Sequence, residues 1–316
     1  MKKIKILKFK KKIKKKISLN NFLKILLLSL FSLSTFLLGI LYEKTISNKS
    51  FSEEFEVTQS VDSKELASIQ NKVIKKNYIF KIKWGDLGKR MVEDGVIDKT
   101  KLAQAITGTD EFPKDLDKYF EDGQNKIEVN PQNAQFWVDV LWGLGLANKN
   151  RILEEGAMMQ DGDASNFAST GGWTLGPVDP MSVYSKYSYI NLSEKQQKTV
   201  EEIAGNIYRP CCGNSTAFPD CNHGMAALGL IELMVSQGFS KRETYKTALA
   251  FNTYWFPQTY LDIAYHLEKN ERDYSKVSPK ELLSKTFSSA AGYDAIRQKI
   301  GQLQWPALGD GGSCAA

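Results

Sequence analysis

Four side chains of the kinds that bind metals or exchange disulfides lie within thirteen residues of this chain: Cys211, Cys212, Cys221 and His223. The rest of the chain holds one further cysteine, Cys314, and one further histidine. Thiolate and imidazole are the ligands that zinc and copper(I) prefer, and thiols are also the groups that exchange disulfides. We therefore expect the functional centre of the protein in this segment.

A metal site is the first hypothesis for these four side chains. Three cysteines and one histidine satisfy a tetrahedral zinc ion without any other ligand. Cys211 and Cys212 are adjacent, so their sulfur atoms converge only if the turn bends sharply, which Pro210 and Gly213 permit. His223 stands at the start of a predicted helix, whose N-terminus favours thiolates over thiols. The sequence thus predicts a site for Zn or Cu.

Thiol-disulfide chemistry is the second hypothesis. Either Cys211 or Cys212 can pair with Cys221 and close a loop of about ten residues. One thiol then stays free beside a helix start, where its pKa is lowered. Cys314, close to the C-terminus, can resolve that thiol or pair with it. The third hypothesis is structural, with one disulfide and a spare cysteine stapling an otherwise inert domain. The sequence leaves all three hypotheses open.

The elements that position the cluster are helices. Ser193 with Gln196 forms one capping box, and Ser240 with Glu243 forms another. Apolar residues at helical spacing follow each box, and a further apolar helix starts at His223. The cluster is therefore expected in a turn between two helices.

The region before these helices is expected to contain a small lobe and a buried helix. Residues 78–84 alternate with the period of a half-buried strand and precede two short predicted helices, so we expect a small α/β lobe over 71–108. Residues 133–148 are apolar around most of a helix surface, which predicts a buried helix. Residues 156–182 are rich in Gly and Pro and are expected to form a long loop.

The N-terminus has the pattern of a signal anchor. Residues 1 to 16 contain ten lysines and no acidic residue. The stretch from Ile25 to Tyr42 is uncharged; as a helix it rises about 27 Å, close to a bilayer core of about 30 Å. The positive-inside rule places the lysines in the cytoplasm and the bulk of the chain outside it, with the anchor in the plasma membrane. A cleaved signal peptide is the alternative.

The positive charge of the chain belongs to this leader. The net charge is +6, but without the eleven lysines of residues 1–24 there are 31 basic residues against 36 acidic ones, a net of −5. We therefore expect no nucleic-acid partner. The leader is expected to contact anionic lipid.

The expected fold class is mainly α, a single-pass membrane helix followed by an exported multi-helix domain. The expected segments are a basic cytoplasmic leader (1–21), a transmembrane signal anchor (22–43), a polar stalk (44–70), the small α/β lobe (71–108), a helical domain with the Cys/His cluster (109–308) and a disordered tail (309–316).

A family resemblance rests on the segment Tyr208-Arg-Pro-Cys-Cys-Gly-Asn-Ser, between an acidic helix and an Ala-rich helix. Over about residues 193–245 the chain resembles the thiol-oxidoreductase domain of the cytochrome c maturation apparatus. That domain is membrane-tethered and three-helical, with an Arg-Cys-x-x-Cys motif between its first two helices. The resemblance implies that Cys211 and Cys212 occupy a redox region and that the substrate is an exported protein. In this chain the two cysteines are adjacent, and Cys221 and His223 have no counterpart.

Overall fold

The computed structural model describes residues 34–35, 62–160 and 162–306. The chain divides into two units, residues 1–59 and 60–316, and the description below concerns the second. The expected leader and tail lie outside the described residues, as does the expected signal anchor apart from residues 34–35. Within the described part of the chain, no helix has the length and apolar character needed to cross a membrane.

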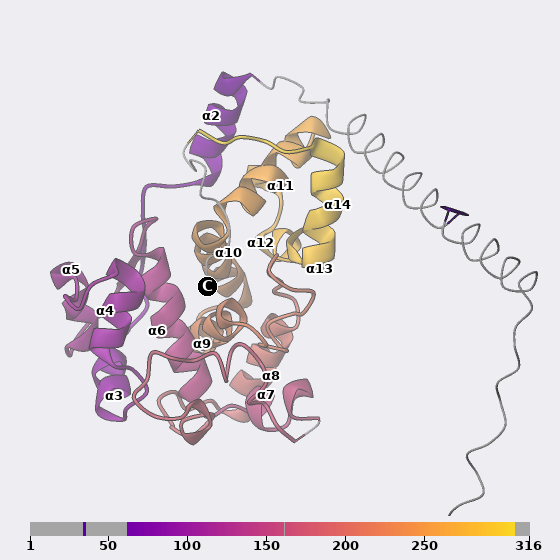
Figure 1. The fold of residues 1–316 in the computed structure, drawn as a ribbon. Coiled ribbons are helices and arrows are strands. Elements are labelled where there is room, and N and C mark those ends of the chain that lie inside the picture. The colour runs from indigo at the N-terminus through magenta and orange to yellow at the C-terminus, as the bar shows by residue number, and fades with distance from the viewer. Residues whose placement is uncertain (1–33, 36–61, 161, 307–316) are drawn as a thin grey trace, which may run out of the picture. The chain divides into compact units, whose positions relative to one another are not determined.

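The described chain is mainly helical, which confirms the expected fold class at that level (Figure 1). Its α-helices are α2 (Ser63–Val73), α3 (Leu87–Glu93), α4 (Lys99–Thr107), α5 (Lys114–Asp117), α6 (Ala134–Ala147), α7 (Arg151–Glu154), α8 (Glu194–Ala204), α9 (Asn222–Ser236), α10 (Lys241–Trp255), α11 (Pro257–Lys269), α12 (Pro279–Leu282), α13 (Lys285–Ser288) and α14 (Ala290–Ile300). The short 3-10 helices are η1 (Lys118–Phe120), η2 (Ala157–Met159), η3 (Pro180–Ser182) and η4 (Tyr274–Lys276), and the strands are β1 (Tyr78–Phe80) and β2 (Ile127–Val129).

Helices α6 and α9 form the centre of the core. Nearly every residue of both is buried, as the all-round apolar sequence of 133–148 predicts. Their backbones touch: a Cβ added at Gly145 would lie 2.2 Å from the Met225 carbonyl oxygen, and one at Gly229 would lie 2.6 Å from that of Leu141. Glycine is therefore required at both positions. This close packing fixes the N-terminal end of α9, next to which the cysteines lie.

A small sheet and a group of aromatic rings cover the other end of α6. Strand β1 pairs antiparallel with β2, with Tyr78 opposite Val129. The β1 strand was predicted, whereas β2 was not. Trp84 is buried, donates its indole N–H to the Tyr119 carbonyl oxygen across 2.7 Å and stacks edge-on against Trp137. The lobe is thus attached to the helical core through aromatic packing.

Both predicted capping boxes are present. Ser193 and Gln196 cap α8, and Ser240 and Glu243 cap α10, each with the two reciprocal hydrogen bonds. The helices therefore start where the sequence indicates. The segment between α8 and α9 carries the cysteines.

The long loop over 156–182 packs on α6, where the Trp142 indole N–H donates to the Ser169 carbonyl oxygen across 2.6 Å. Trp173 is buried and donates its indole N–H to the Val96 carbonyl oxygen across 3.0 Å. Earlier in the loop, the Ser169 amide donates to the Asp220 carbonyl oxygen across 3.1 Å, and the Phe167 ring meets the Phe218 ring edge-on. The loop therefore supports the cysteine segment from one side.

Candidate metal centre

Three cysteine sulfurs converge in the turn before α9. The Sγ atoms of Cys211, Cys212 and Cys221 all lie within 4.8 Å of one another, and those of Cys211 and Cys221 are 3.5 Å apart. All three are free thiols. Cys211 is exposed, while the other two are partly buried. Cys314 lies outside the described residues. The group can hold a metal ion.

The backbone of the turn bends back on itself, which brings the adjacent cysteines together. Tyr208 and Ser215 form an antiparallel bridge, so the chain reverses direction around the cysteine pair. The carbonyl oxygen of Cys212 accepts a hydrogen bond from the amide of Ala290, the first residue of α14, across 2.9 Å. The sharp bend that convergence of Cys211 and Cys212 requires is present.

Arg209 lies beneath the sulfur atoms and is almost completely buried, at 1% exposure. Its Nε–H donates to the Sγ of Cys221 across 2.9 Å. The terminal nitrogens donate to the carbonyl oxygens of Asn214 and Phe218 and, across 2.6 Å, to the Asp220 carboxylate. A single guanidinium therefore ties the turn together and places a positive charge on the cluster. The sequence prediction did not include it; the signal is an arginine directly before Pro-Cys-Cys.

Gly224, in the first turn of α9, makes room for this guanidinium. A Cβ at this position would lie 2.4 Å from the Cζ atom of Arg209. Because such a contact is far shorter than real Cβ contacts, any side chain at 224 displaces the arginine. Gly224 is thus a second residue of the site that the sequence prediction missed.

The three cysteines of the cluster differ in their pKa values. Hydrogen bonds from Cys211 and Cys212, assisted by the nearby Arg209 guanidinium, hold the pKa of Cys221 well below its ordinary value. The pKa of Cys211 is raised by hydrogen bonding with the sulfurs of Cys212 and Cys221 and by burial. For Cys212 the hydrogen bond from Cys211 lowers the pKa, but the bond to Cys221 and burial outweigh it and raise the pKa to about 11. Cys221 therefore has the lowest pKa of the three cysteines.

His223 is not part of the sulfur group. Its ring is buried against Trp255 and Phe256, with centroid distances of 5.8 and 4.5 Å. Its Nδ1 lies 2.8 Å from the amide oxygen of Asn222, which only accepts, so Nδ1 carries the hydrogen. Burial lowers the pKa of His223 to about 4. Of the four predicted ligands, the structure brings the three cysteines together and places the imidazole among aromatic rings.

Comparison with known proteins gives no match for this chain. No family model matches it, and no curated protein or solved structure matches it. The function proposed below rests on the side chains described here.

Two buried carboxyl groups also escaped the sequence prediction. Glu232, inside α9, is fully buried and accepts hydrogen bonds from the side-chain amides of Asn148 and Asn150. Asp139, in α6, accepts one from Gln135, while its Oδ2 has no hydrogen-bond partner among the described residues. Burial raises the pKa of Glu232 well above its ordinary value and that of Asp139 to about 7. Protonation reduces the cost of burying each group.

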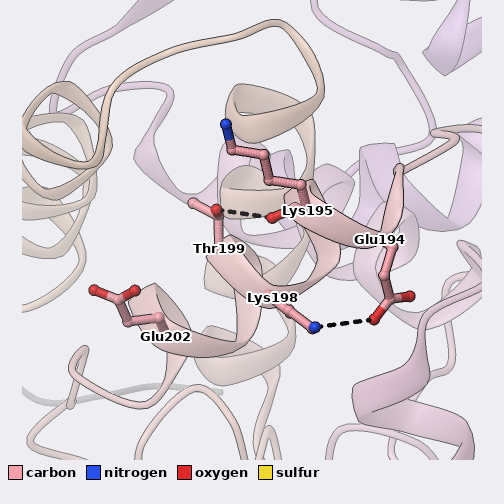
Figure 2. A pocket seen from close by; sticks show the side chains of 5 residues that line it. All are labelled: Glu194, Lys195, Lys198, Thr199 and Glu202. Atoms are coloured by element: carbon pink, nitrogen blue, oxygen red, sulfur yellow. Dashed lines mark hydrogen bonds and ion pairs between the residues drawn. The ribbon is translucent and has the colours of Figure 1, made fainter.

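A surface hollow over α8 is a poor alternative site. It has a volume of about 510 Å³ and is lined by five side chains of that helix, namely Glu194, Lys195, Lys198, Thr199 and Glu202. Figure 2 shows these side chains pointing in different directions, with Lys198 paired to Glu194. Glu202 pairs with Lys241 of α10. The charged groups are not directed at a common point, so the cysteine cluster is the best candidate for chemistry in the described structure.

Proposed function

We propose that the protein binds one thiophilic metal ion, Zn²⁺ or Cu(I), through Cys211, Cys212 and Cys221. The observation that carries the proposal is the convergence of the three sulfurs within 4.8 Å of one another. A zinc–sulfur bond of about 2.3 Å places two sulfurs of one tetrahedral ion about 3.8 Å apart. Only small side-chain movements therefore separate the observed arrangement of the three sulfurs from a metal-binding geometry.

The charges around the sulfurs favour zinc over copper(I). Three thiolates leave a surplus of one negative charge around a divalent ion and two around Cu(I). Arg209 supplies one positive charge in contact with Cys221, although Asp220 shares that guanidinium. The surplus charge at the partly buried site is therefore smaller with Zn²⁺, and burial of unpaired charge is costly. With three protein ligands, a fourth position on zinc stays open for water or another ligand.

Metal titration of the full-length chain tests this proposal. Protein purified without chelator and kept reduced is titrated with Zn²⁺ and, separately, with Cu(I). We expect one ion per chain, and a large loss of affinity in Cys211→Ser, Cys212→Ser and Cys221→Ser. Cys314→Ser is the matched control and should bind like the wild type. Absence of binding, or binding that survives Cys221→Ser unchanged, contradicts the proposal.

A second candidate function is thiol-disulfide exchange with an exported protein. The 3.5 Å between the sulfurs of Cys211 and Cys221 favours it, together with the exposure of Cys211. The resemblance of residues 193–245 to thiol oxidoreductases points the same way. A rapidly alkylating cysteine below neutral pH and a disulfide that glutathione reduces would support this function, and cysteines inert to both reagents would exclude it.

The proposed setting for either function is extracytoplasmic. The lysine-rich leader and the uncharged stretch from Ile25 to Tyr42 support an anchor with its N-terminus in the cytoplasm and in contact with anionic lipid. Protease added to cells whose outer plasma-membrane face is exposed tests this orientation. We expect it to degrade the C-terminal region while the plasma membrane is still intact. Degradation only after the plasma membrane is broken would place the C-terminal region in the cytoplasm and contradict this orientation.

A further inference from the structure

We propose that the metal site is emptied by oxidation: a disulfide compound accepts two electrons from Cys211 and Cys221, the two sulfurs bond, and the ion is released. This inference rests on the metal-binding function proposed above and concerns the regulation of the same site. The oxidant class is a low-molecular-weight or protein disulfide.

The distances select which two cysteines join. The sulfurs of Cys211 and Cys221 are 3.5 Å apart, and these residues are separated by ten positions in the chain. Adjacent cysteines such as Cys211 and Cys212 make a strained disulfide. The Sγ of Cys212 also lies 3.7 Å from the Asp220 carboxylate and 3.9 Å from the Asn214 carbonyl oxygen, so its S–H has other acceptors within reach. Cys212 is therefore left as the unpaired thiol.

The two cysteines that form the disulfide differ in exposure and in how firmly their sulfurs are held. Cys211 is exposed, so an incoming disulfide reaches its sulfur first. Cys221 is partly buried and its sulfur is held by the Nε–H of Arg209 across 2.9 Å. Since Arg209 has 1% exposure and three further hydrogen-bond acceptors, Cys221 stays in place next to Cys211. The second sulfur is thus positioned for an intramolecular attack.

The exchange balances in two steps. In the first, the Cys211 sulfur, which is a thiolate when it holds the metal, attacks one sulfur of the disulfide compound; the S–S bond of that compound breaks and one thiolate leaves. In the second, the Cys221 thiolate attacks the Cys211 sulfur of this mixed disulfide and expels the other thiolate. The protein loses two electrons, and the disulfide compound gains two and becomes two thiols. Only Cys212 then remains as a ligand, so the ion dissociates, and a dithiol reductant restores the site.

The test uses the full-length, zinc-loaded protein and oxidised glutathione. Zinc release is followed with a chromophoric chelator, and the disulfide is assigned by proteolysis and mass spectrometry. We expect release of all bound zinc together with a Cys211–Cys221 disulfide, and recovery of binding after reduction with dithiothreitol. Cys212→Ser should bind zinc poorly yet form the same disulfide, and Cys314→Ser should behave as the wild type.

The outcomes separate this inference from the function on which it rests. If the wild-type protein takes up no zinc, both the metal site and its proposed release by oxidation, here called the switch, are overturned. A protein that binds zinc and retains it under oxidised glutathione keeps the metal site and overturns the switch. Zinc release with a disulfide that involves Cys212 or Cys314 also overturns the switch as drawn.

Discussion

Arg209 donates its Nε–H to the Sγ of Cys221 across 2.9 Å from a position with 1% exposure beneath the cysteine turn. The same guanidinium contacts the Asp220 carboxylate and two backbone carbonyl oxygens. A single buried side chain therefore sets both the shape of the turn and the charge felt by its sulfurs. This relationship makes Arg209 a positioning residue for the proposed metal ligands.

Arg209→Lys keeps the charge but cannot donate in several fixed directions at once. Because the carbonyl oxygens and Asp220 then lose partners in a buried site, we expect the free energy of unfolding to fall by about 3 kcal/mol. Zinc affinity should fall roughly tenfold or more, as it does when partners of metal ligands are removed. Denaturant unfolding and competition with a zinc chelator measure the two effects. Unchanged affinity would show that the guanidinium does not position Cys221.

Gly224→Ala tests the same contact from the opposite side. The added methyl group would lie 2.4 Å from the guanidinium, so we expect Arg209 to shift, zinc affinity to fall and stability to drop by about 1–3 kcal/mol. Alanine otherwise favours a helix over glycine by about 1 kcal/mol, so a loss points to the steric conflict. Gly213→Ala is the matched control, because a Cβ there meets nothing within 4 Å. Equal effects of the two variants would argue against the close approach.

His223→Phe tests whether His223 is a fourth metal ligand, as the sequence predicts, or packs apart from the sulfurs, as in the structure. The imidazole is buried against Trp255 and Phe256, so a phenyl ring fits that environment and the three sulfurs are untouched. We expect the variant to fold and to bind one zinc ion with affinity close to that of the wild type. Calorimetric titration measures this. Loss of the bound ion in a folded variant would restore His223 as a ligand.

Asp139→Asn tests the cost of a buried carboxyl group. The pKa of about 7 in the folded protein lies above the ordinary value of 3.8, so the folded state holds the proton more tightly. The free energy of unfolding should therefore fall as pH rises between those two values, by about 4 kcal/mol in total, and level off above pH 7. The asparagine variant should lack that decline. Parallel pH profiles for both proteins would mean that Asp139 keeps an ordinary pKa.

The helices could be predicted because their signals are local. The capping boxes at Ser193 and Ser240 each lie within four residues, and the apolar pattern of 133–148 alone predicts the buried α6. Strand β2 was missed, since three residues carry little periodicity and their partner β1 is about fifty residues earlier. Signals between neighbouring residues thus predicted the helices, whereas the pairing of two strands far apart in the chain could not be predicted from them.

The cysteines of the site were predicted from the sequence, but the residues that hold them in place were not. Residue type and clustering identified Cys211, Cys212 and Cys221, whereas only the folded turn shows that their sulfurs converge. Two of the partners of Arg209 are backbone carbonyl oxygens, whose positions cannot be predicted from residue type. His223 was expected as a ligand because it belongs to the same cluster of metal-binding residue types, but its ring packs against Trp255 and Phe256 at the end of α10. Side-chain direction at a helix start depends on tertiary packing.

X-ray absorption spectroscopy at the metal edge tests the central claim most directly. The full-length protein, reduced and loaded with zinc, should show three sulfur atoms at about 2.3 Å around the ion and one light atom completing the shell. Cys221→Ser should lower the sulfur number or fail to hold the ion. A shell of nitrogen and oxygen atoms at about 2.0–2.1 Å, without sulfur, would contradict metal binding by Cys211, Cys212 and Cys221.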